Sequence, residues 1–175
     1  MPGIKHCLAT AVLLLGACGG GSGTGVDGGP GAGGCSCLDT LVAVMEGCQP
    51  SGTCIEQAVG TTAANVCYSN GVKIRISVTS LPTDAMSMTM SVKKGAVCYS
   101  MVMTETESGD MTMVFKNGTG ATIATLGTNE NDERTVTCPG GSPSVITSAC
   151  STQASSAGTL SNPPTTDCTT GTCNY

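Results

Sequence analysis

Residues 72–78 read VKIRISV, in which β-branched apolar residues alternate with Lys73, Arg75 and Ser77. An alternation with a period of two is typical of a β-strand that has one face on the core and one face in water. The same kind of segment recurs further along the chain, at residues 85–92, 97–105, 111–116, 121–126 and 133–138. The sequence from residue 72 to residue 138 therefore predicts about six strands.

The links between these predicted strands are short and carry turn residues. They include KKG at residues 93–95, SGD at residues 108–110 and NG at residues 117–118. Short links join neighbouring antiparallel strands, whereas parallel strands need a crossover of a dozen or more residues. We therefore expect an antiparallel meander with one apolar face, and that face requires a cover.

Two short helices are predicted before the strands. Between residues 38 and 45, Leu, Val and Met side chains recur at helical spacing, and Gly47 follows the last of them. Thr53 and Glu56 then have the spacing of a capping box, which predicts a second helix. With these helices covering the sheet, residues 35–175 form a disulfide-rich α+β domain.

Residues 139–175 are rich in Ser, Thr, Gly and Pro and show almost no hydrophobic periodicity. We expect this part to be an irregular C-terminal flap that cysteines hold in place. The composition of the whole chain bounds its partners as well: 175 residues carry a net charge of −5 and only seven Lys or Arg. A nucleic-acid partner is not expected, because its phosphates require a basic surface.

The first residues have the order of a secretory signal. Lys5 and His6 precede an apolar run that ends at Leu15, and the run is followed by Gly16-Ala17-Cys18. This run is about half of the roughly 20 residues that a membrane-spanning helix needs. We therefore expect export rather than a transmembrane anchor.

The tetrad LGAC, from Leu15 to Cys18, resembles the lipobox of bacterial lipoproteins. The resemblance implies that residues 1–17 are removed and that a lipid on Cys18 attaches the chain to a membrane. Residues 18–34 would then be the lipidated cysteine and a Gly-rich tether. Gly19 in place of Asp implies the outer membrane of a Gram-negative cell. The alternative is an ordinary signal cleaved near Ala17, with Cys18 left to form a disulfide.

Ten cysteines remain when Cys7 is assigned to the signal and Cys18 to the lipid. An even number in an exported chain predicts up to five disulfides. The spacing leaves their connectivity open. The candidates are Cys35, Cys37, Cys48, Cys54, Cys67, Cys98, Cys138, Cys150, Cys168 and Cys173.

Catalytic side chains are scarce. The only histidine is His6, in the expected signal, so the remaining chain has no imidazole for a Ser–His or Cys–His pair or for a zinc site. Ser91 and Lys94 fit S-x-x-K, but the partner motifs S-D-N and K-T-G are absent. Residues 128–133 gather oxygen ligands without the register of a known calcium loop. We expect no enzymatic activity and no cofactor.

Methionines occupy alternate positions in three consecutive predicted strands. Their thioethers are soft ligands that would select Cu(I). Methionine also replaces Leu and Phe as a flexible core residue, which is the interpretation we favour for a chain with one Phe and no Trp. Burial distinguishes the two, because metal ligands must be reachable. The residues are Met86, Met88, Met90, Met101, Met103, Met111 and Met113.

The sequence thus predicts a cell-envelope lipoprotein with a non-enzymatic binding or structural role. Its protein or envelope partner is not specified by any motif. The alternative is a Cu(I)-binding protein that uses the methionine face.

Complete oxidation of the ten cysteines can be tested directly. Alkylation of the native, unreduced protein followed by mass spectrometry should label none of them, since each is expected in a disulfide. Alkylation after reduction under denaturing conditions is the control and should label all ten. Two or more reactive thiols in the native protein would contradict the disulfide prediction.

Overall fold

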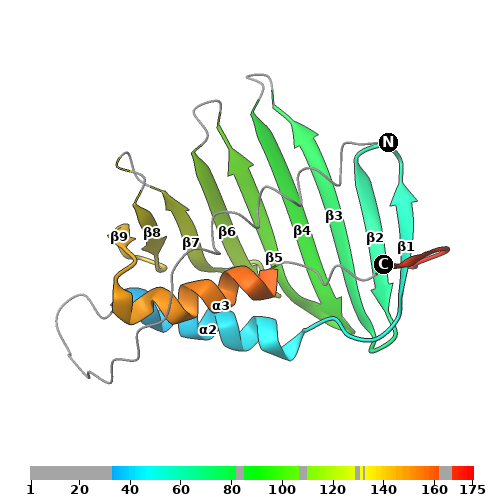
Figure 1. The fold of residues 1–175 in the computed structure, drawn as a ribbon, viewed down its shortest axis with the longest axis horizontal. Helices are drawn as coiled ribbons and strands as arrows, with labels where there is room; N and C mark the ends of the chain where they lie inside the picture. Colours follow the sequence, from blue (N-terminus) through cyan, green and yellow to red (C-terminus); the bar gives the residue numbers. More distant parts are fainter. Residues whose placement is uncertain (1–32, 82–84, 107–109, 129–130, 132, 162–166) are drawn as a thin grey trace.

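The structure is a computed structural model that describes residues 33–81, 85–106, 110–128, 131, 133–161 and 167–175. It has an α+β fold in which a ten-stranded sheet is packed against two helices, α2 (Gly33–Gly47) and α3 (Ser151–Ser161). Figure 1 shows the two helices side by side across the ends of the strands. The expected α+β class and antiparallel meander are confirmed, whereas the sheet is larger than the predicted six strands.

The strands follow one another across the sheet in chain order from β1 to β9, and every one of these pairs is antiparallel. β10 returns to the first edge and pairs in parallel with β1. The strands are β1 (Cys54–Val59), β2 (Ala63–Tyr68), β3 (Val72–Ser80), β4 (Met86–Lys94), β5 (Ala96–Glu105), β6 (Met111–Asn117), β7 (Thr122–Thr128), β8 (Arg134–Thr137), β9 (Ser144–Val145) and β10 (Thr169–Thr170). β3 to β8 are the six predicted strands.

The first predicted helix is confirmed as α2. Leu38, Leu41 and Met45 are fully buried, as their helical spacing predicts. The helix begins at Gly33, so it includes the last two residues that were assigned to the tether. Disulfides at both ends fasten it across the sheet, since Cys37 is bonded to Cys138 after β8 and Cys48 to Cys98 in β5.

The second predicted helix is wrong, because residues 54–59 form β1. A helix of this length is marginal without extensive packing. Pairing with β2 and β10 instead supplies a partner for the backbone, and the Cys54–Cys168 disulfide holds the strand in place. Gly60, with a φ of +64°, ends the strand and starts the turn into β2.

The prediction of a wholly irregular C-terminal flap is also wrong. Besides β9 and β10, the segment contains a 3-10 turn (Ser148–Cys150) that leads into α3. The buried positions of α3 are small residues, among them Ala154 and Ala157, and they pack in the same core as α2. Because these residues are small, the face shows little hydrophobic periodicity and the local sequence does not indicate a helix. Packing against α2 stabilises the helix instead. The cover of the sheet is one N-terminal and one C-terminal helix.

Tyr99, in β5, is buried in the core beneath this cover, with an exposed fraction of 3%. Burial disfavours the phenolate and raises the pKa of Tyr99 from 10 to about 12.

The stability of the fold should therefore depend on Tyr99 in alkali. The unfolded chain releases this proton near pH 10, and the folded chain retains it until about pH 12. Between these values the free energy of unfolding should fall by about 1.4 kcal/mol per pH unit more in the native protein than in Tyr99→Phe. Urea unfolding of both proteins across this range measures the difference. Equal slopes would contradict the assignment.

Candidate functional site

Disulfides join the sheet to α2 and to the C-terminal segment. The bonded pairs are Cys37–Cys138, Cys48–Cys98, Cys54–Cys168 and Cys67–Cys173. Cys150 is disulfide-bonded as well. The side chain of Cys35 and the whole of Cys18 lie outside the described part of the structure. The described bridges are structural, because each one fastens a covering element to the sheet.

The methionine residues come together as the sequence predicts. In cross-strand register, Met88 lies opposite Met103 and Met90 opposite Met101, and Met103 also faces Met113 in β6. Six of the seven side chains are between 2% and 9% exposed; Met86, at the start of β4, is 37% exposed. The buried six belong to the same core as Leu38 and Leu41 of α2. This burial supports core packing over a metal site that solvent can reach.

Truncation of the methionines tests their role in the core. Met88→Ala and Met101→Ala should each lower the free energy of unfolding by about 2–5 kcal/mol, since burial is lost and a cavity remains. Thr89→Ala, on the opposite and exposed face of β4, is the matched control and should change it by less than about 0.5 kcal/mol. Urea unfolding of the oxidised protein gives these values. Unchanged stability in the methionine variants, together with tight Cu(I) binding by the native protein, would contradict core packing.

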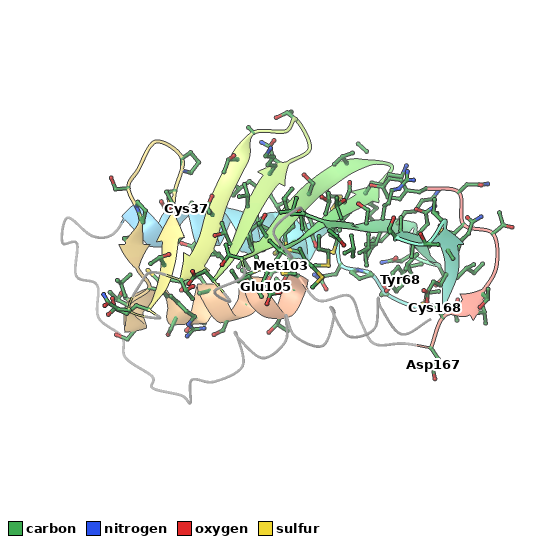
Figure 2. The ribbon with its side chains drawn as sticks, turned by 90° about the horizontal axis from the view of Figure 1, so that it is seen from above. Cys37, Tyr68, Met103, Glu105, Asp167 and Cys168 are labelled. Carbon is green, nitrogen blue, oxygen red and sulfur yellow. A yellow bond between two sulfur atoms is a disulfide. The ribbon has the colours of Figure 1, made fainter. Side chains whose placement is uncertain are left out.

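The C-terminal segment crosses the face of β1 to β4 that lies opposite the core. It leaves Cys168 beside β1 (Figure 2) and reaches β2, where Cys173 is bonded to Cys67. The backbone N–H of Cys173 donates to Gln57 at 3.0 Å, and the side-chain amide of Asn65 donates to the carbonyl of Cys173 at 3.4 Å. These contacts place Cys173 over β1 and β2, and the two residues after it reach Lys73 of β3 and Ser91 of β4.

The ring of Tyr175 lies among cationic side chains there. The Lys93 ammonium is 4.1 Å from the ring centroid and the Arg75 guanidinium carbon is 5.8 Å from it, so both are at cation–π distance. The Tyr175 hydroxyl donates to Ser91 Oγ at 2.6 Å. The Lys73 ammonium donates to the carbonyl of Asn174.

Four cations therefore share the paired ends of β3 and β4. We call Lys73, Arg75 and Lys93, which share the uncovered face of the sheet, the basic cluster; Lys94 lies on the other face of β4. Lys73 lies directly opposite Lys93, and Lys94 directly opposite Val72 at the start of β3. Arg75 and Lys94 are exposed and the other two are half-buried. None of the four forms an ion pair with a carboxylate of the described residues.

Sequence reasoning missed this cluster. Lys73 and Arg75 were recognised only as the wet face of a strand, and Lys93 and Lys94 only as hairpin-turn residues. The pairing of β3 with β4 brings Lys73 opposite Lys93, and the turn residues at positions 81–84 are the sequence signal for that pairing. The contribution of Tyr175 had no sequence signal, because it depends on the path that the disulfides impose on the C-terminal segment.

Elsewhere in the described residues, one apolar hollow is small and no cluster of metal-binding side chains occurs. An apolar hollow between β6, β7 and β8, lined in part by Met111, Leu126 and Ile146, has a volume of about 30 Å³. Ligand sites are commonly ten times larger or more. No group of three or more His, Cys, Asp or Glu side chains among the described residues has the geometry to hold a metal ion.

Comparisons with family models, with curated proteins and with solved structures gave no match for this chain. Within the described residues, no helix is long and apolar enough to cross a membrane.

Proposed function

We propose that this chain is a cell-envelope lipoprotein, held by a lipid on Cys18, whose folded part has a non-enzymatic binding or structural role. The observation that carries the proposal is the set of four disulfides between distant segments. Such bridges indicate an oxidising, extracytoplasmic location. The lipobox-like tetrad that ends at Cys18 gives a mechanism for reaching that location and staying there.

The position of the first described residues supports an anchored arrangement. The helix α2 begins at Gly33, directly after the Gly-rich residues 19–32. Its second turn is fixed to the end of β8 by the Cys37–Cys138 bridge. A pull on the N-terminal side is therefore borne by a covalent link to β8 and not by the helix alone.

The uncovered face of the sheet supports a binding role. Its central row runs from Thr89 through Val102 and Val114 to Thr125, and all four side chains are exposed or half-exposed. Hydroxyl groups of this kind are weak nucleophiles unless a base activates them, and the sole histidine is His6. The face is suited to contact with a partner rather than to catalysis.

The second candidate function, Cu(I) binding, rests on the clustering of the methionine thioethers. Met86 alone among the seven is exposed beyond a tenth of its surface. A Cu(I) site would require the core to open, so we place this function second.

Lipidation is the decisive test of the proposal. Mass spectrometry of the membrane-purified protein should find a diacylglyceryl group on Cys18. The Cys18→Ala variant should move to the soluble fraction, because the thioether attachment point is lost. Cys150→Ala, which removes a different cysteine, is the control and should remain in the membrane fraction. An unmodified N-terminus at another residue would overturn the proposal.

A further inference from the structure

We propose that the basic cluster is a docking surface for the phosphate groups of anionic lipid headgroups, so that this end of the sheet faces the membrane. The proposal rests on the membrane anchoring proposed above. A long tether keeps the domain near the membrane but does not fix its orientation, whereas a docking surface would fix it.

The first argument is the register of β3 and β4. Lys73 and Lys93 are directly opposite each other in an antiparallel pair. Like charges in this position are destabilising, and here no carboxylate of the described residues relieves them. A Tyr ring and a backbone carbonyl are the partners that the structure provides. These neutral groups leave a net positive site that an anion would stabilise.

The second argument is the distribution of charge along the strands. The basic cluster lies where β3 begins and β4 ends. Glu105 lies at the end of β5, Asp110 just before β6 and Glu133 just before β8, all at the opposite end of the sheet. Carboxylates lie near the basic end as well, among them Glu46 of α2, Glu56 of β1 and Asp167, so the end as a whole carries both signs. The positive charge is local to the uncovered face of β3 and β4, where Lys73, Arg75 and Lys93 lie together. Near a negatively charged surface, this local charge orients the molecule.

The third argument is the position of the tether. β4 and β8 run in the same direction, because every pair between them is antiparallel. Cys138, which follows β8, therefore lies at the same end of the sheet as Lys94. Cys138 is bonded to Cys37 in the first turns of α2. Figure 1 shows α2 and the end of β4 at one side of the sheet. The described part of the chain thus starts at the end of the sheet that carries the basic cluster.

Tyr175 fits the same surface. Its ring lies beside Lys93 and Arg75, and its hydroxyl is bonded to Ser91. Tyrosine is favoured where one end of the side chain is apolar and the other is wet, as at a headgroup layer. Each cation contributes only a weak attraction to an anionic surface. A tether makes weak contacts effective, because it holds the cluster at a high local concentration near the headgroups.

Vesicle binding tests the proposal without any contribution from the lipid anchor. The oxidised chain from residue 18 onward, carrying Cys18→Ala, is mixed with phosphatidylglycerol vesicles or with neutral phosphatidylcholine vesicles, and the bound fraction is measured by flotation. We expect binding to the anionic vesicles only. Raising the ionic strength from about 0.01 M to about 0.15 M should reduce it, because the Debye length shortens from about 30 Å to about 8 Å.

Variants at two cations of the uncovered face assign the binding to the basic cluster. Arg75→Gln combined with Lys93→Gln should weaken partitioning onto anionic vesicles by about 25-fold, or roughly fivefold for each charge. The charge-preserving pair Arg75→Lys with Lys93→Arg should retain it. Arg134→Gln, at the opposite end of the sheet, removes one charge without touching the cluster and should match the parent chain. Circular dichroism and thermal unfolding confirm that each variant is folded.

Three results would overturn the proposal. One is equal binding to neutral and anionic vesicles, and another is full retention of binding in the double Gln variant. The third is binding to heparin, a soluble polyanion, without binding to anionic vesicles, which would assign the cluster to a soluble polyanionic partner. Because the test protein lacks Cys18, any of these results leaves the lipidation result unaffected.

Discussion

Disulfides between distant segments are the constraint on which the rest of this structure depends. Cys37 and Cys138 are 101 residues apart, Cys67 and Cys173 are 106 apart, and Cys54 and Cys168 are 114 apart. In the chain-entropy account, closing a loop of about 100 residues is worth about 4.7 kcal/mol. The chain needs such links because a single Phe and three Tyr, with no Trp, supply little aromatic area to the core. Both covering helices and the C-terminal segment then have fixed places on the sheet.

The same disulfides determine which face of the sheet is covered and which face stays exposed. Bridges at Cys37 and Cys48 hold α2 over the face that carries the methionines, so those side chains become core. The Cys54–Cys168 bridge lies on the core side at β1, and the Cys67–Cys173 bridge holds the last residues over part of the other face. The remainder of that face stays uncovered. Stability is thus concentrated on one side of the sheet, while the other side keeps the polar and charged groups that are available to a partner.

Methionine suits this core for a physical reason. Its unbranched side chain has several rotatable bonds and fills irregular space between a twisted sheet and a helix. Met90 and Met101 occupy facing positions and are 2% and 3% exposed. The helix that contacts the sheet is α2, while α3, whose buried positions are Ala, Gly and Ser, lies against α2.

The sequence by itself determined the strands from β3 to β8 and the helix α2, because each of these elements buries one face and exposes the other. The sequence also indicated disulfides and an oxidising location, because it contains many cysteines. β2 was missed because Asn65 and Val66 are both buried, one beneath the C-terminal segment and one in the core, so its alternation disappears. β1 and α3 were missed because partners distant in sequence select their conformation.

Only the tertiary structure decided the disulfide partners and the basic cluster. Local spacing carries no information on which cysteines meet after the chain has crossed the sheet. Lys73 and Lys93 are neighbours only through the register of β3 and β4, and Tyr175 joins them only through the path of the C-terminal segment. Periodicity is a property of neighbouring residues, whereas a site on this sheet is built across strands, and for that reason the fold class was predictable and the site was not.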